Sequence, residues 1–289
     1  MKTLFGPVKH KIISVAIVSL GALLGFEALS FILGIYQIGM FVHVAVYIFL
    51  FHVFWLTFLF DLHLKNRFWK SLKERTEHVF NWHYFRHYLN FYILPGLIYW
   101  SVVCILFLNP FNTLIKQTAI VAGSFCMSVA YWFFKETYSR KLELHEHSIK
   151  YLSLVKLFTA FLLYSAVLGI TWYFGYGRNF LITFVFIGTY ALLYQALFQH
   201  KLLSLNAHAF MLLTAAATTA AGLAVYQFWN SEYFTGGLVL LSVYNFMWGI
   251  LHHRMDKTLN AKVIGEYFFI TVLLLSILIS THNFGPRIS

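Results

Sequence analysis

The stretch IGMFVHVAVYIFLFHVFWLTFLFDL, residues 38–62, decides the class of fold. It is an almost unbroken run of apolar and aromatic residues, interrupted by Thr57 and by the imidazole or charged side chains of His43, His52 and Asp61. A helix needs about 20 apolar residues to cross the hydrocarbon core of a bilayer. The run therefore predicts a transmembrane helix.

The composition of the whole chain agrees with this prediction. The 289 residues are 60% hydrophobic and 11% charged, whereas a soluble domain is about 25% charged. Much of the apolar surface must therefore face lipid. The net charge of +11 comes from basic residues between the apolar runs, so we expect membrane lipids with anionic headgroups, and not nucleic acid, as partners. Cys104 and Cys126 lie inside apolar runs and are expected to be buried thiols.

Nine such runs organise the chain. Strands are excluded because no ten-residue alternating pattern is found. The sharpest breaks between runs fall at 109–110, 175–177 and 230–231. The first run is too long for the apolar part of a signal peptide, so we expect it to remain as a span. The sequence predicts an all-α polytopic membrane protein, a single transmembrane domain over 1–289 with about nine transmembrane helices, at 12–36, 38–62, 89–108, 113–135, 154–174, 179–200, 205–229, 232–253 and 261–281.

The positive charges divide unequally between the two sides that alternating spans define. Of the 21 Lys and Arg residues, 18 fall on the side of the amino terminus, and Lys116, Arg178 and Arg287 fall on the other. Cytoplasmic connections carry the excess of Lys and Arg in membrane proteins. This pattern predicts a cytoplasmic amino terminus, an exoplasmic carboxyl terminus and a multi-pass protein of the cell (cytoplasmic) membrane.

Residues 64–88, in the first long cytoplasmic connection, mix aromatic and basic side chains. Phe68, Trp69, Trp82 and Phe85 are interspersed with lysines and arginines. This composition is typical of an amphipathic helix that lies in the headgroup layer. We therefore expect one interfacial helix over about 64–88.

Imidazole and carboxylate side chains gather at the predicted cytoplasmic face. In WGILHHRMDK, residues 248–257, a helical step of about 100° places His252 and Asp256 close to one face and turns His253 away. Other spans begin or end with histidines at the same depth. Imidazole with few carboxylates suits Fe or Zn better than Mg or Ca. The hypothesis is one Fe or Zn site built from His63, His200, His208, His252 and Asp256. The alternative is that water solvates each side chain separately.

Two short motifs form a second group of candidate ligands. HYFRH places His83 and His87 at i and i+4 on one helix face, a spacing common among metal ligands. ELHEHS contains His145 and His147, which share a face only if the segment is extended. In ligand type and membrane depth, HYFRH and the pair at 252–253 resemble the histidine boxes of membrane-bound desaturases and hydroxylases. The H-x-x-H-H boxes of those enzymes are missing here.

Four polar side chains are expected inside the membrane. Glu27 lies about 12 Å below the outer face of its span, and His43 lies at a similar depth on the next span. His52 is near the middle of the bilayer, and Asn245 extends the polar face of the span at 232–253. Buried polar groups of this kind either line a proton or solute path or form structural hydrogen bonds between helices.

The sequence leaves three functions open, because it contains no common nucleophile, phosphate-loop or dinucleotide motif. The first is a His-rich, metal-dependent oxidoreductase or hydrolase that uses Fe or Zn on a lipid or isoprenoid at the cytoplasmic face. The second is a non-catalytic transporter or subunit of a membrane complex, which leaves an oligomer or a partner chain open. The third is a haem-b electron carrier, for which His52 lacks an obvious partner at its own depth.

Overall fold

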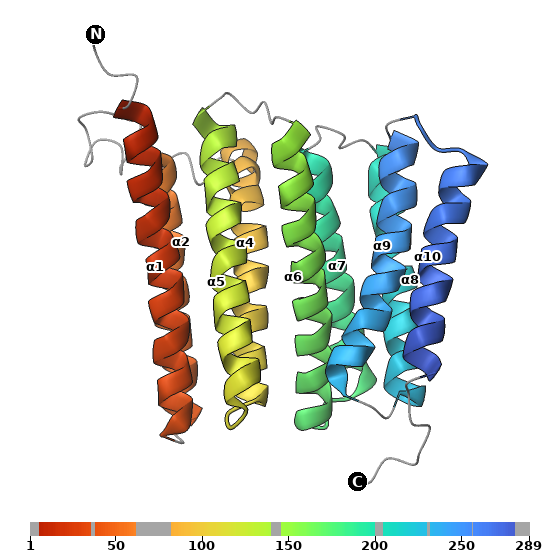
Figure 1. Cartoon of the computed structure of the whole chain (residues 1–289), viewed down its shortest axis with the longest axis horizontal. Helices are drawn as coiled ribbons and strands as arrows, with labels where there is room; N and C mark the ends of the chain where they lie inside the picture. Colours follow the sequence, from red (N-terminus) through yellow and green to blue (C-terminus); the bar gives the residue numbers. More distant parts are fainter. Residues whose placement is uncertain are drawn as a thin grey trace. The chain divides into compact units, whose positions relative to one another are not determined.

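The chain is an integral, multi-pass membrane protein built of helices. Its computed structural model describes residues 6–35, 38–61, 82–139, 146–199, 205–229, 232–255 and 257–280. No described residue lies in a strand. The described helices are α1 (Gly6–Gly34), α2 (Ile38–Asp61), α4 (Trp82–Leu108), α5 (Thr113–Ser139), α6 (Glu146–Tyr173), α7 (Arg178–Gln199), α8 (Leu205–Phe228), α9 (Tyr233–Met255) and α10 (Ala261–Ser280) (Figure 1).

Within these ranges, eight helices are long and apolar enough to cross a membrane, and α2 adds a shorter apolar stretch, Ile38–Phe54. Large apolar side chains such as Leu24, Phe125 and Phe269 are exposed on the outer faces of the helices, as expected where lipid is the solvent. The predicted class is confirmed. The predicted breaks are confirmed too, since α4 ends at Leu108, α6 at Tyr173 and α8 at Phe228.

Four helices extend four or more residues beyond the predicted spans, one of them α1, which begins at Gly6 rather than at 12. The helix α4 begins at Trp82 rather than at 89, α5 continues to Ser139 rather than 135, and α6 begins at Glu146 rather than at 154. A helix satisfies its own backbone hydrogen bonds in lipid and in the headgroup layer alike, so the apolar run marks the membrane crossing and not the end of the helix. Residues 82–88 of the expected interfacial helix therefore belong to α4, and residues 64–81 lie outside the described ranges.

The helices group into two compact units, Met1–Val155 and Lys156–Ser289. The single domain over 1–289 stays a prediction. The first unit contains α1, α2, α4 and α5. There α1 packs along α2 and α5, and α4 packs along α5 (Figure 1).

Two glycines of the first unit allow neighbouring helices to pack closely. A Cβ atom at Gly25 of α1 would lie 2.8 Å from Cγ2 of Ile48 on α2. A Cβ atom at Gly123 of α5 would lie 2.5 Å from Cγ2 of Val102 on α4. Small residues allow helix backbones to approach closely in a membrane, where no hydrophobic effect drives helices together.

The second unit is built in the same way. Its helices pack in the order α7 on α8, α8 on α9 and α9 on α10. The helix α6 meets α9 at Gly237, where a Cβ atom would overlap the Ser165 hydroxyl and lie 3.0 Å from the Ser165 backbone nitrogen. No residue of α10 is buried, and this helix contacts α9 through the ring of Tyr267, which covers Gly249.

Candidate functional site

The most unusual polar residue in the first unit is His52. It lies in the middle third of α2, and its side chain is 2% exposed. Neither ring nitrogen has a hydrogen-bond partner among the described residues. Its ring instead packs among aromatic rings, with centroid distances of 5.8 Å to Tyr99 and 6.2 Å to Phe51. A buried polar group without a partner is costly, so such a group needs an explanation.

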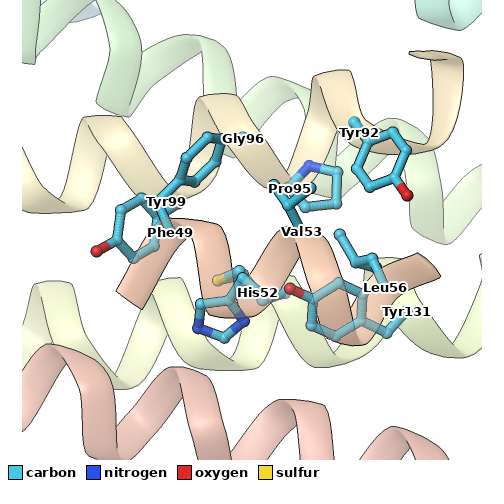
Figure 2. Close-up of a pocket in the computed structure, with 10 residues that line it drawn as sticks. Phe49, His52, Val53, Leu56, Tyr92, Pro95, Gly96, Tyr99 and Tyr131 are labelled. Carbon is cyan, nitrogen blue, oxygen red and sulfur yellow. The ribbon is translucent and has the colours of Figure 1, made fainter. Parts of the chain in front are cut away.

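A small cavity adjoins this imidazole. Its volume of about 10 Å³ is room for about one water molecule. The phenol hydroxyl of Tyr131, on α5, points toward His52, whereas the hydroxyl of Tyr99 points away (Figure 2). The cavity is lined by residues from α2, α4 and α5, namely Phe49, His52, Val53, Leu56, Tyr92, Pro95, Gly96, Tyr99, Met127 and Tyr131.

The two tyrosines of this cavity differ in how their hydroxyls are satisfied. Tyr99 donates a hydrogen bond to the backbone oxygen of Ala45 at 2.6 Å. Tyr131 is fully buried, and its hydroxyl has no partner among the described residues. Two side chains from different helices, His52 of α2 and Tyr131 of α5, therefore line the cavity with polar atoms that have no described partner.

The helix α1 also lies against this site, at Gly21. A Cβ atom at Gly21 of α1 would lie 3.9 Å from Cε1 of His52 and 3.5 Å from Cε1 of Phe51. Those are ordinary contact distances, so α1 packs against the imidazole, and an alanine would fit at this position as well.

A row of polar side chains extends from this cavity along α5. Gln117, Ser124 and Tyr131 are spaced by seven residues, which returns to within about 20° of the same face and spans about 10 Å per step. The Ser124 hydroxyl is buried without a partner among the described residues. Ser101 of α4 is likewise buried without a partner there, and the neighbouring contact between Val102 and Gly123 puts the two serines at the same level.

Glu27 lies at the far end of this row. Nε2 of Gln117 donates to Oε2 of Glu27 at 3.5 Å, which joins α5 to α1. His43 is not part of the row, because it is exposed and its Nδ1 bonds to the backbone oxygen of Gly39 at 2.7 Å, within α2. Glu27 and His43 thus have separate partners. The row itself is a pattern that the spacing in α5 contains and that the sequence analysis missed.

The predicted metal ligands are described only in part. His63, His200 and Asp256 lie outside the described residues. His208 is half-buried on α8, where its Nδ1 lies 3.1 Å from the Tyr190 hydroxyl of α7. His252 is half-buried on α9, with its ring stacked on Trp248 at 5.7 Å. The site of five ligands stays a prediction.

The remaining candidate residues are not seen to contribute ligands to a metal centre among the described side chains. His253 bonds through Nδ1 to the Thr258 hydroxyl at 2.8 Å and packs against Tyr267 of α10. Asn245 is half-buried in α9. Among the residues described, no group of three or more His, Cys, Asp or Glu side chains could hold a metal. His145 lies outside the described ranges, and the side chains of His83, His87 and His147 are not described.

Two buried polar residues of the second unit were also missed. Lys156 was counted with the cytoplasmic charges although it falls inside the predicted span 154–174; it lies inside α6 and is 4% exposed. Gln195 of α7 is fully buried, and neither atom of its amide has a partner among the described residues. The sequence offered no signal for the burial of either residue, because burial depends on which helix faces meet.

These features define a polytopic helical membrane protein with buried polar sites inside its helix packing. The chain belongs to the family described as protein of unknown function (DUF5656), whose model matches residues 26–281. No curated protein and no solved structure matches the chain.

Proposed function

We propose that the chain is a non-catalytic transporter, or the transporting subunit of a membrane complex, which passes protons through its first unit by way of His52. The observation that carries this proposal is the buried imidazole with two unpartnered ring nitrogens, facing the Tyr131 hydroxyl across a cavity with room for one water. Ionisable residues inside the membrane commonly mark proton or ion paths.

Imidazole chemistry fits this role. A neutral histidine accepts a proton on one ring nitrogen and can release the proton of the other. A water in the cavity would connect the ring to Tyr131, whose hydroxyl both donates and accepts. Since neither side chain is tied to another described group, a proton can arrive and leave without first breaking a structural hydrogen bond.

The polar row on α5 gives the path its direction. From Tyr131 it leads past Ser124 and Ser101 to Gln117 and Glu27. Each seven-residue step is about 10 Å, which is too far for direct transfer between side chains. Transport therefore requires water to enter between the steps, in a conformation wider than the one described.

The orientation and the membrane are part of the same proposal. The charge split supports a cytoplasmic amino terminus in the cell membrane, with the basic connections against anionic headgroups. The His52 end of the path is then nearer the cytoplasm, and Glu27 is nearer the outside.

A metal-dependent enzyme acting on a lipid or isoprenoid is the second candidate. The contact between Tyr190 and Nδ1 of His208 favours it, because it leaves Nε2 free to bind Fe or Zn while the outer partner orients the ring. Bound Fe or Zn in the purified protein, lost on His252→Ala and kept on His253→Ala, would place this candidate first. A haem carrier ranks third, because the cavity beside His52 has room for about one water and no second histidine among its lining residues.

Proton flux into proteoliposomes tests the proposal. A potassium gradient with valinomycin sets the membrane potential, and an entrapped pH-sensitive dye reports the flux. His52→Gln should reduce the flux at least about tenfold, as expected for loss of a proton-transfer group. The matched control is His43→Gln, an exposed histidine of the same helix, which should leave the flux unchanged. Equal flux in wild type, both variants and empty liposomes contradicts the proposal.

A further inference from the structure

The second unit contains a buried lysine that no described residue neutralises. Lys156 of α6 is 4% exposed and belongs to the span Tyr151–Tyr173. No hydrogen bond or ion pair joins its amine to any described residue. A buried charge normally has a partner or binds a ligand, since leaving it uncompensated is strongly unfavourable.

The packing of α6 against α7 identifies what faces this lysine. A Cβ atom at Gly188 of α7 would lie 2.5 Å from Cδ2 of Leu163 on α6. One residue further along each helix, the hydroxyls of Tyr164 and Thr189 are 2.9 Å apart. These two contacts fix the register of the antiparallel pair.

Lys156 lies seven residues before Leu163 on α6, and Gln195 lies seven residues after Gly188 on α7. Seven helical steps return to within about 20° of the same face. Since α6 and α7 are antiparallel, a step backward on α6 and a step forward on α7 arrive at the same level. Lys156 and Gln195 therefore lie on facing sides of the two helices.

Gln195 matches the lysine as a binding partner for an anion. Its side chain is fully buried, and neither Nε2 nor Oε1 has a partner among the described residues. An ammonium and an amide N–H on facing helices together offer one charged and one neutral donor. Lysine is a common binder of phosphate as a point charge, and a neighbouring amide donor would fix the orientation of the phosphate oxygens.

The depth of the pair indicates where the anion comes from. Lys156 is five residues, about 8 Å, from the start of its span. Gln195 is four residues, about 6 Å, from the end of α7 at Gln199. Both thus lie just below the end of the helices at which lipid phosphates of one leaflet are found, and the route from the headgroup layer is short.

We infer that Lys156 and Gln195 form a phosphate-binding site between α6 and α7, which takes either the phosphate of a lipid headgroup or a free phosphate. The site is in the second unit and does not depend on the proton path. Its ligand compensates the buried ammonium, and Gln195 supplies the second hydrogen bond.

The test uses the full chain in nanodiscs of phosphatidylcholine. One arm titrates short-chain phosphatidic acid, and the other titrates inorganic phosphate against chloride at equal ionic strength. Binding is followed by the thermal midpoint of unfolding and by tryptophan fluorescence. Saturation by phosphatidic acid alone assigns the site to a lipid, and saturation by both ligands assigns it to the phosphate group itself.

Lys156→Met should weaken the binding roughly tenfold or more, and Gln195→Leu should weaken it less, because the charged hydrogen bond is the stronger one. The matched control is Lys262→Met, an exposed lysine of α10, which should bind as the wild type does. Without ligand, Lys156→Met should melt at or above the wild-type midpoint, because it removes a buried charge. If Lys156→Met does not fold, the comparison of phosphate binding between Gln195→Leu and the wild type decides. No saturable binding by the wild type, or equal binding by the Lys156 and Lys262 variants, overturns the inference.

Discussion

The two units of this protein treat buried polar side chains differently. In the second unit, the hydroxyls of Tyr164 and Thr189 bond to each other at 2.9 Å, and the Tyr190 hydroxyl lies 3.1 Å from the ring of His208. In the first unit, His52, Tyr131, Ser101 and Ser124 are buried without partners among the described residues. Buried polar groups without a described partner also occur in the second unit, for example Ser165, Thr214 and Gln195, but in the first unit two of them, His52 and Tyr131, line one cavity.

This difference distinguishes structure from function inside a membrane. A satisfied polar pair between helices stabilises the packing modestly, by about 0.6 kcal/mol on average. An unsatisfied buried group opposes folding, so its presence calls for a role that pairing would abolish, such as passing a proton. In the second unit, Gln195 is buried without a described partner, and the register of α6 and α7 places it opposite the buried charge of Lys156, so this pair is the candidate ligand site.

The largest expected effect concerns what the two units have in common, the close helix contacts at glycine. Gly237→Leu should lower the free energy of unfolding by about 3 kcal/mol or more, because the new side chain would meet the backbone of Ser165, which cannot move aside. Gly123→Leu in the first unit should do less damage, because it meets the Val102 side chain. Thermal unfolding in detergent measures both.

Gly34→Leu is the control for this prediction. A Cβ atom at Gly34 has nothing within 4 Å among the described atoms, so the substitution should change the stability by less than about 0.5 kcal/mol. If Gly34→Leu and Gly237→Leu were equally harmful, the glycine contact between α6 and α9 would not be a determinant of the fold.

The class of fold could be predicted from the sequence because lipid imposes a single strong requirement. A stretch such as 38–62 must be a helix if it lies in hydrocarbon, whatever surrounds it. The same reasoning failed at helix ends such as Trp82 and Glu146, because a helix does not stop where hydrophobicity stops. Lys156 falls inside the predicted span 154–174, but it was counted with the charges of the cytoplasmic connections, and its burial in α6 was not foreseen.

The candidate site was predicted less well, because contacts between helices depend on which faces meet. His52 was recognised from its depth alone, but its neighbours Tyr99 and Tyr131 come from helices whose arrangement the sequence does not specify. Glu27 was identified as an intramembrane carboxylate, yet its partner is Gln117 and not His43. The spacing of seven in α5 was available in the sequence, but it acquires meaning only once α5 is known to face α1 and α4.

Two variants that each lose one tyrosine hydroxyl should have smaller effects on stability, and these effects should have opposite signs. Tyr164→Phe should lower the free energy of unfolding by about 0.5–1.5 kcal/mol, because it leaves the Thr189 hydroxyl unpaired. Tyr131→Phe should leave the stability unchanged or raise it by up to about 1 kcal/mol, because it removes a hydroxyl that is buried without a described partner. Unfolding in mixed micelles, on variants that differ from wild type by one oxygen atom, gives both values.

Tyr99→Phe separates the effect of pairing from the effect of location. Tyr99 lines the same cavity as Tyr131 but donates to the Ala45 backbone oxygen. Its loss should therefore destabilise the protein as the loss of the Tyr164 hydroxyl does. If all three variants shifted the stability in the same direction, the distinction between paired and unpaired polar groups would have to be abandoned.

The smallest expected effect on stability is at Glu27, at the outer end of the polar row. Glu27→Gln keeps the shape of the side chain and an oxygen that can still accept from Gln117, so the free energy of unfolding should change by less than about 0.5 kcal/mol. The proton flux should nevertheless fall, because an amide cannot take up a proton as a carboxylate does. The fall should be smaller than for His52→Gln, since Glu27 is half-buried and water can reach the next step of the row without it. A flux that is unchanged in Glu27→Gln while His52→Gln abolishes it would keep His52 as the proton site but end the path on α5, and the protons would then have to leave the cavity by another route between α2 and α4.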